Sequence, residues 1–337
     1  MQQPETEQST KGLQVVTSIV LNWNDFDATR NCVRSLLEEP QKGHFVVIVD
    51  NASVDGSYER LRAEFSHLPV LQSGGNLGFA RGCNVGIRYA LENQDPDFVF
   101  LLNNDAILAR GSLAAGIARA SRPEAGTVGL VGGKILYQSN KKKIWSAGGR
   151  ISLLRAQAVS RGGGHQDVGQ YDEALQVTFV TGAMMLITRE MLRRVGPLPE
   201  EYFFGQEEWD YSVAANRAGL SLWYEPKMQS YHDGDGSHRN HDPKFIYNSY
   251  RNKLIFAKKY INPVLFPLWY FSFAYVYRHL LAERHLFRLH AGRSEGRQMK
   301  YALDCAIRDY RLRPKSPISE GDLTQFAIEA SDRHDIS

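Results

Sequence analysis

The chain contains 337 residues, 43% of them hydrophobic and 23% charged, which is the composition of a globular protein with one large core. A formal net charge of +3 is too small to indicate nucleic-acid binding. Three dispersed cysteines, Cys32, Cys83 and Cys305, argue against a disulfide framework and fit a reducing, cytoplasmic compartment. Residues 1–12 are polar and lack the features of a signal peptide, so we expect a disordered lead-in there.

The N-terminal part of the chain alternates between apolar, strand-like runs and helical segments. We predict strands at 15–21, 45–49 and 69–72, and helices at 27–39 and 57–65. The first two strands end in polar groups, Asn22-Trp23-Asn24 and Asp50-Asn51. This alternation predicts a doubly wound, mainly parallel sheet, and such sheets bind ligands at the carboxyl ends of their strands.

A glycine-rich segment, residues 74–88, opens a helix that we expect to end near residue 91. The chain contains neither a G-x-G-x-x-G nor a G-x-x-x-x-G-K-S/T pattern, which disfavours a dehydrogenase or a P-loop enzyme. Close packing between helix and sheet can explain Gly82 and Gly86. It explains Asn76 and Arg81 less well, so we regard those two as candidate ligand contacts.

A buried strand predicted at 98–102 runs directly into Asn103-Asn104-Asp105. At the carboxyl end of a strand, Asp105 could hold a divalent cation against a phosphate. It could equally cap the helix that follows, because Asp is a favoured N-cap residue. This segment alone leaves both interpretations open.

The middle of the chain carries weaker signals. We predict a helix at 112–120, a pair of strands around the glycines of 128–136, a long strand at 177–188 and a helix at 189–195. Residues 138–174 lack periodicity, so we expect a flexible, solvated insertion whose lysines 141–143 are surface charge.

Three carboxylates, Glu207, Glu208 and Asp210, begin a predicted helix. Acidic residues in a first turn can simply favour the helix macrodipole. Aromatic neighbours on both sides predict partial burial, which raises a carboxyl pKa as a general base requires. His232 follows a strand predicted at 220–225 and lies in a polar loop, where it is either structural or a ligand.

Taken in order, these segments resemble the family 2 inverting glycosyltransferases of the GT-A fold, in particular bacterial rhamnosyltransferase-like members. The resemblance rests on Asn22-Trp23-Asn24, the 49–57 and 76–86 segments, Asn103-Asn104-Asp105, Gly182-Ala183 and the 203–210 segment, and it covers residues 13–260. It implies a Rossmann-like α/β domain with a mixed, mainly parallel sheet flanked by helices.

The resemblance also implies roles for individual residues. Asn22, Trp23, Asn24, Asp50 and Asn51 would hold the nucleotide base, and Asn76 and Arg81 would line the nucleotide or its diphosphate. Asn103-Asn104-Asp105 stands where the family has its D-x-D motif, so Asp105 would ligate Mg²⁺ or Mn²⁺ while Asn103 contacts the ribose or sugar. His232 would be a further metal ligand. Glu208 would be the general base, paired with Glu207, and Trp209 and Asp210 would support the acceptor pocket.

The function implied is transfer of a sugar from a dTDP- or UDP-sugar, with rhamnose from dTDP-rhamnose as the leading donor, to a hydroxyl of a lipid-linked or polysaccharide acceptor in cell-wall or O-antigen synthesis. A single displacement would invert the anomeric carbon. The alternative is a non-catalytic, nucleotide-sugar-binding scaffold of a glycan assembly complex.

The C-terminal part of the sequence differs in character. A helix is predicted at 247–259, an aromatic stretch at 263–277 is too short to span a membrane, and arginines recur from 278 to 313. We expect a helical extension at 261–313 that either contacts the inner face of the cell membrane peripherally or packs on the catalytic domain or a second copy in a homodimer. Because its arginines are interleaved with Leu, Phe and Tyr, nucleic acid is disfavoured as a partner. Residues 314–337 are polar, and we expect a loose tail.

Overall fold

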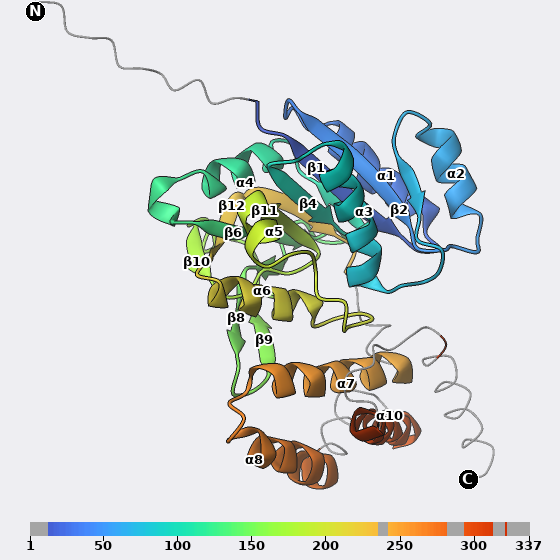
Figure 1. The fold of residues 1–337 in the computed structure, drawn as a ribbon, viewed down its shortest axis with the longest axis vertical. Helices are drawn as coiled ribbons and strands as arrows, with labels where there is room; N and C mark the ends of the chain where they lie inside the picture. Colours follow the sequence, from blue (N-terminus) through green and yellow to red (C-terminus); the bar gives the residue numbers. More distant parts are fainter. Residues whose placement is uncertain (1–12, 235–241, 282–292, 313–320, 322–337) are drawn as a thin grey trace, which may run out of the picture.

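The computed structural model describes residues 13–234, 242–281 and 293–312 together with Gly321. The predicted lead-in at 1–12 and, apart from Gly321, the predicted tail at 314–337 lie outside the described residues. A ten-stranded sheet occupies the upper part of Figure 1, and the C-terminal helices form a layer below α6.

The first part of the chain forms the predicted alternation of strands and helices. Its elements are β1 (Val16–Asn22), α1 (Phe26–Leu37), β2 (His44–Asp50), α2 (Ser57–Glu64), β3 (Val70–Gln72), α3 (Phe79–Asn93) and β4 (Phe98–Leu102). Strands β3, β2, β1 and β4 are neighbours in that order, and all pair in parallel. Asn22, the last residue of β1, is therefore in register with Asp50, the last residue of β2.

The middle of the chain completes the sheet. Its elements are β5 (Ala106–Leu108), α4 (Ser112–Ala120), the short 3₁₀-helix η1 (Pro123–Ala125), β6 (Val128–Tyr137), β7 (Ile144–Ala147), β8 (Gly149–Ser152), β9 (Gln157–Ser160), β10 (Leu175–Val177), β11 (Met184–Thr188), α5 (Arg189–Arg194), α6 (Glu207–Arg217) and β12 (Ser221–His232). The sheet order is β10-β12-β6-β11-β4-β1-β2-β3, with β5 paired to β12 and β7 to β6. Only β11 runs against both of its neighbours, β4 and β6, so β4, β6 and β12 end at the same edge as β1 and β2. The predicted mixed, mainly parallel sheet flanked by helices is confirmed.

Both faces of the sheet are covered, which explains why β2 and β4 are almost continuously apolar. Phe98, Phe100 and Leu102 of β4 point into the core layer that contains α1, α2 and α4, whereas Val99 and Leu101 point into the layer that contains α3, α5 and α6. The packing explanation for two glycines also holds: a Cβ added at Gly82 or Gly86 would lie 2.6 Å from Leu21 or Ile19. Helix α3 therefore approaches β1 as closely as its backbone allows.

Four predictions for the middle of the chain are wrong. Residues 128–137 form the single strand β6, because glycines at 129, 132 and 133 admit side chains from the neighbouring elements without breaking the strand. The predicted strand at 177–188 is two strands, β10 and β11. Strand β12 extends to His232 instead of ending at residue 225, because Pro226 is accommodated at a register shift.

The fourth correction concerns the insertion at 138–174, which is neither irregular nor loosely attached. It contains β7, β8 and β9, and Ile144 and Ala147 are fully buried. The buried Lys134 of β6 pairs with Asp167 at 2.8 Å and with Asp172, which fastens the far end of the insertion to the sheet.

The C-terminal layer contains α7 (Pro243–Tyr260), α8 (Phe266–Phe271), the π-helix η3 (Ser272–Leu281) and α10 (Arg293–Leu312). Helix α7 packs against α10 through Tyr247 and Leu254, and against α6 through Phe256 and Tyr260. Because α7 contacts both parts, the division at residue 260 stays a prediction. No helix among the described residues is long and apolar enough to cross a membrane.

Candidate functional site

The ends of β1 and β2 form one hydrogen-bonded unit. Asn22 Nδ2 donates to Asp50 Oδ1 at 2.7 Å and to Ser53 Oγ at 3.0 Å, and Asp50 Oδ2 accepts from the Ser53 N–H at 2.9 Å. Both Asn22 and Asp50 are fully buried. The Ser53 hydroxyl also accepts from the N–H of Asn24, which has a positive φ of 53°. These contacts shape the turn that leaves Trp23 49% exposed, as a flat apolar surface beside polar groups.

The glycine-rich segment docks on the same edge. Asn51 Nδ2 donates to Asn76 Oδ1 at 3.0 Å, and its Oδ1 accepts from the Leu77 N–H at 3.1 Å. Gly78 has a φ of +77°, and a Cβ there would lie 2.0 Å from the Phe203 carbonyl oxygen. Arg81 Nε donates to the Glu200 carbonyl at 3.2 Å, while its buried Nη2 has no hydrogen-bond partner among the described residues. Asn51 and Asn76 thus hold the loop from below, and Arg81 supplies a cation in the first turn of α3.

The next strand end brings Asn103, Asp105 and His232 together. His232 is the last residue of β12 and is paired with Ala106 of β5, so its ring lies over the 103–105 turn. Its Nε2 lies 3.1 Å from Asp105 Oδ1 and 3.2 Å from Asn103 Nδ2. The ring is 5% exposed, and its Nδ1 has no hydrogen-bond partner among the described residues. Asn104 instead turns inward and donates to Thr29 Oγ1 at 3.1 Å.

The acidic pair Glu207-Glu208 begins α6 at this same edge. The N–H of Asn103 donates to the Ala183 carbonyl at 3.0 Å, and Gly182, one residue earlier, lies 3.8 Å (measured from an added Cβ) from the Glu208 Cβ. The turn before β11 thus separates the acidic pair from the 103–105 turn. Burial raises the pKa of Glu208 to about 7 and that of Glu207 well above its usual value. A hydrogen bond between the two carboxyls raises the pKa of Glu207 and lowers that of Glu208, so Glu208 is the member that ionises first.

Asp210 is placed differently from the two glutamates. Its carboxylate accepts from Tyr202 Oη at 2.8 Å, from Lys259 Nζ at 2.8 Å and from Tyr260 Oη. The side chain is buried, and these contacts tie α6 to α7 and to the preceding loop. Trp209 packs edge-on against Phe256 with ring centroids 5.9 Å apart. Asp210 and Trp209 thus hold α6, the helix that begins with Glu207 and Glu208, in place.

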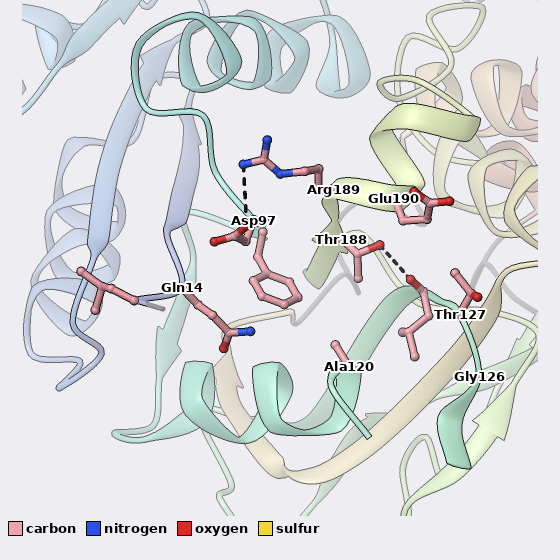
Figure 2. A pocket seen from close by; sticks show the side chains of 11 residues that line it. Gln14, Asp97, Ala120, Gly126, Thr127, Thr188, Arg189 and Glu190 are labelled. Carbon is pink, nitrogen blue, oxygen red and sulfur yellow. Dashed lines mark hydrogen bonds and ion pairs between the residues drawn. The ribbon is translucent and has the colours of Figure 1, made fainter. Parts of the chain in front are cut away.

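The opposite edge of the sheet contains a cavity of about 640 Å³, shown in Figure 2. It is lined where β4 begins and β11 ends, by residues that include Asp97, Thr188 and Arg189. Arg189 is paired with Asp95 at 2.5 Å and lies 3.7 Å from Asp97, and Thr188 Oγ1 donates to the Val128 carbonyl. None of the predicted site residues lines this cavity, and its arginine, Arg189, is already engaged with Asp95 and Asp97.

Three residues at the site were missed by the sequence analysis. Trp145 of β7 packs on His232 with ring centroids 4.7 Å apart, although it belongs to the segment expected to be solvated. Asn248 and Asn252 of α7 donate to the loop before Glu207. Their signal was available: two asparagines four residues apart inside a predicted helix, where asparagine is unfavourable without a partner.

The order of these elements agrees with a comparison with known families. The model of the family described as "Glycosyl transferase family 2" matches residues 17–196, more than half of the chain. The chain belongs to glycosyl transferase family 2. The matched segment includes the strand ends up to Asp105 and stops before Glu207 and His232.

Relatives and solved structures extend this result. The chain is 26% identical over 211 residues to the N-acetylglucosaminyl-diphospho-decaprenol L-rhamnosyltransferase of Mycobacterium tuberculosis, an alignment that covers 56% of this chain and 66% of the relative. It is 22% identical over 274 residues to the dTDP-rhamnosyl transferase RfbF of Shigella flexneri, covering 79% and 88%. The predicted similarity to rhamnosyltransferases is confirmed.

Two solved structures share the fold. One is the mannosyltransferase PcManGT from Pyrobaculum calidifontis in complex with GDP-Man and Mn²⁺, with a TM-score of 0.50, 18% identity and coverage of 95% of this chain and 81% of that one. The other is GalNAc-T7 with UDP, GalNAc and Mn²⁺, with a TM-score of 0.58, 13% identity and coverage of 91% and 59%. The predicted GT-A fold is confirmed.

Proposed function

We propose that the protein is an inverting glycosyltransferase that moves a sugar from a nucleoside diphosphate to an acceptor hydroxyl. One observation carries the proposal: in a chain of this family, Asp105 with His232 and the pair Glu207-Glu208 lie at one sheet edge, beside the same turn before β11. A non-catalytic scaffold would have no need of a buried carboxyl whose pKa is raised to about 7. The proposed catalytic domain is residues 13–260.

The residues at the 103–105 turn fit a divalent cation. Adjacent ligands of an octahedral ion with bonds of about 2.1 Å lie about 3.0 Å apart, and His232 Nε2 is 3.1 Å from Asp105 Oδ1. A His232 ring that carries its proton on Nδ1 would point the Nε2 lone pair at the same position as the Asp105 carboxylate, as a shared cation requires. When bound, Mg²⁺ or Mn²⁺ would neutralise charge on the departing diphosphate.

Within the described residues no group of three His, Cys, Asp or Glu side chains converges on one point. Asp105 and His232 would therefore supply two ligands and leave the remaining positions for water and phosphate oxygens, as Mg²⁺ sites at substrate phosphates commonly do. Asn103, whose amide faces His232, would hydrogen-bond the ribose or sugar, and Asn104 would brace the turn against Thr29.

We propose that the nucleotide lies along the ends of β1, β2 and β3. Trp23 would stack on the base, and Asn24 and Asn22 with Asp50 would set the position of that ring. Asn51 and Asn76 would hold the 74–78 loop against the ribose, and Arg81 would attract the diphosphate with its free Nη2.

Glu208 would act as the general base. It would take the proton of the acceptor hydroxyl as that oxygen bonds to the anomeric carbon and the carbon–phosphate-oxygen bond breaks. The leaving diphosphate keeps the bonding electron pair, and the single displacement inverts the anomeric centre. Glu207, which holds its own proton, would orient Glu208, while Asp210 would secure the helix from below.

The donor and acceptor follow from the relatives alone. Two relatives are rhamnosyltransferases, one of them named for dTDP-rhamnose and the other for a decaprenol-linked acceptor. We propose rhamnose from dTDP-rhamnose as the sugar and a lipid-linked or polysaccharide glycan as the acceptor, with UDP-sugars as the competing donors.

A lipid-linked acceptor would bring the enzyme to the inner face of the cell membrane. Helices α8 and η3 expose an apolar strip that consists of Val264, Leu265, Leu268, Phe271, Tyr275 and Leu280. Residues 242–313 hold 14 Lys and Arg against 5 Asp and Glu, whereas the rest of the chain holds 26 against 32. An exposed apolar strip on the basic part of the chain fits an anionic bilayer better than a homodimer interface between two such basic surfaces.

The test is turnover by the purified protein with dTDP-rhamnose, UDP-glucose and GDP-mannose, each with Mn²⁺ or Mg²⁺ and a polyprenyl-diphosphate-linked acceptor. We expect transfer from one donor, product of inverted configuration, and no turnover by Glu208→Gln although its donor-induced thermal shift remains. Donor binding without transfer in any combination would indicate the non-catalytic scaffold.

A further inference from the structure

The loop that precedes the acidic pair is held by helix α7 from the C-terminal layer. Asn252 Nδ2 donates to the Phe204 carbonyl at 3.1 Å and to the Gly205 carbonyl at 2.8 Å. The side-chain amide of Asn248, one turn earlier on α7, also donates to the Phe204 carbonyl. Both asparagines are buried, with exposures of 4% and 0%.

The loop needs such support because its backbone is unfavourable. Gly205 has a φ of +81°, and Gln206, which has a Cβ, follows with a φ of +73°. Glycine adopts this conformation at no steric cost, but a residue with a Cβ such as Gln206 is usually held in it by surrounding contacts. The amide oxygens of Asn248 and Asn252 have no hydrogen-bond partner among the described residues, so the two side chains serve the loop as donors.

The peptide groups that accept from these asparagines are also the ones that face the glutamates. The N–H of Gly205, in the same peptide as the Phe204 carbonyl, faces the Glu207 carboxyl and lowers its pKa. The N–H of Gln206, in the same peptide as the Gly205 carbonyl, faces the Glu208 carboxyl and lowers its pKa. Because a peptide group is planar, with its oxygen and hydrogen on opposite sides, fixing the oxygen fixes the direction of the N–H.

We propose that Asn248 and Asn252 are positioning residues that aim the Gly205 and Gln206 N–H groups at the Glu207-Glu208 pair through the two shared peptides. Hydrogen bonds in a chain polarise one another. The bond that Asn252 donates to the Gly205 carbonyl therefore increases the attraction between the Gln206 N–H and Glu208. The catalytic role of these two asparagines rests on the proposed function. The hydrogen bonds that they donate to the loop can be tested without any measurement of turnover.

Removing the hydrogen bonds from Asn252 should change the pKa of Glu208 in a defined direction. Donation by a backbone N–H stabilises the charged carboxylate and lowers its pKa, against the effect of burial. Two or three such bonds lower a carboxyl pKa by about two units, or about one unit each. Among the described residues, the titratable groups that interact with the pair include its own two members and the Cys83 thiol of α3, and none of them is altered by a change in α7.

Asn252→Leu tests the proposal because it keeps the volume and removes both donors. The matched control is Asn84→Leu: Asn84 is equally buried and donates to the Leu198 carbonyl at 2.9 Å, but in a loop that carries no carboxyl of the pair. Both variants should lose thermal stability, so stability alone does not distinguish a positioning role from a structural one.

The deciding measurement is the ¹³C titration of the Glu208 carboxyl in the substrate-free protein, with its signal identified by Glu208→Gln. In Asn252→Leu the pKa of Glu208 should rise by less than about one unit, because the Gln206 N–H remains but is no longer held in place. The acid limb of the kcat profile should rise with it, while the KM for the donor stays the same. Asn84→Leu should leave the titration unchanged.

The test also covers a variant that does not fold and a protein that transfers no sugar. If Asn252→Leu does not fold, Asn248→Ala should shift the titration in the same direction by less, because Asn252 still holds both carbonyls. An unchanged titration in the folded variants overturns the inference even if the wild type transfers sugar. A shifted titration in a protein that transfers no sugar upholds the link and refutes only the proposed function.

Discussion

Replacing Glu208 by Gln should abolish turnover and at the same time stabilise the fold above neutral pH. Burial raises the pKa of Glu208 from its usual 4.5 to about 7 in the folded protein. Between these two values the folded state holds a proton that the unfolded state has released, so the stability of the wild type falls as the pH rises through that interval. Glutamine has nearly the same shape and carries no charge, so it removes this pH dependence.

The size of the effect follows from the two pKa values. A change from 4.5 to about 7 corresponds to at most about 3.5 kcal/mol at pH 8, at about 1.4 kcal/mol per pH unit. Below about pH 4 the wild type and the variant should have equal free energies of unfolding, because both are then neutral at this position. The assay is urea denaturation of both proteins from pH 4 to pH 9.

Parallel curves for the two proteins over that range would refute the burial argument and with it the choice of Glu208 as base. Replacement of the exposed Glu59 by Gln provides the control, because we expect no comparable difference between high and low pH at a solvated carboxyl. A gain in stability that accompanies a complete loss of turnover is typical of a group whose unfavourable environment serves catalysis.

Three further predictions follow. Asp105→Ala should lower turnover by roughly a hundredfold or more and remove the response to Mn²⁺; a variant that keeps wild-type turnover in a Mn²⁺ titration would exclude Asp105 as a metal ligand. Gly82→Ala should cost about 1–3 kcal/mol in urea denaturation, because its Cβ would lie 2.6 Å from Leu21. Gly75→Ala, with nothing within 4 Å, should change stability by less than about 0.5 kcal/mol, and an equal loss in both would contradict the close-packing explanation. In vesicle flotation, the wild type should bind anionic vesicles while Leu268→Glu with Phe271→Glu does not; a wild type that stays unbound, or a double variant that still floats, would count against the apolar strip as the membrane contact.

The fold was predictable where local patterns act alone. The strands β1, β2 and β4 are mostly apolar because helices cover both faces, and the polar groups at their ends mark the edge at which ligands bind. The errors arose where long-range packing overrides local pattern. Glycines suggested a break in β6, but they admit neighbouring side chains, and the apparently irregular insertion is fastened by a single buried lysine, Lys134.

The contrast between what local pattern predicts and what long-range packing decides is greater at the site. The amide and carboxyl groups of Asn22, Asp50 and Asp105 could be placed at one edge because they end strands of one sheet. That Asn252 reaches Glu208 through the Gly205–Gln206 peptide could not be predicted, because it depends on α7 crossing the loop before α6, which joins positions about 45 residues apart. Gln206 is left-handed although it has a Cβ, and the hydrogen bonds that hold its loop come from a helix outside the segment that the family model matches. Sequence motifs locate the acids of such a site, and the packing of the C-terminal layer determines where those acids point.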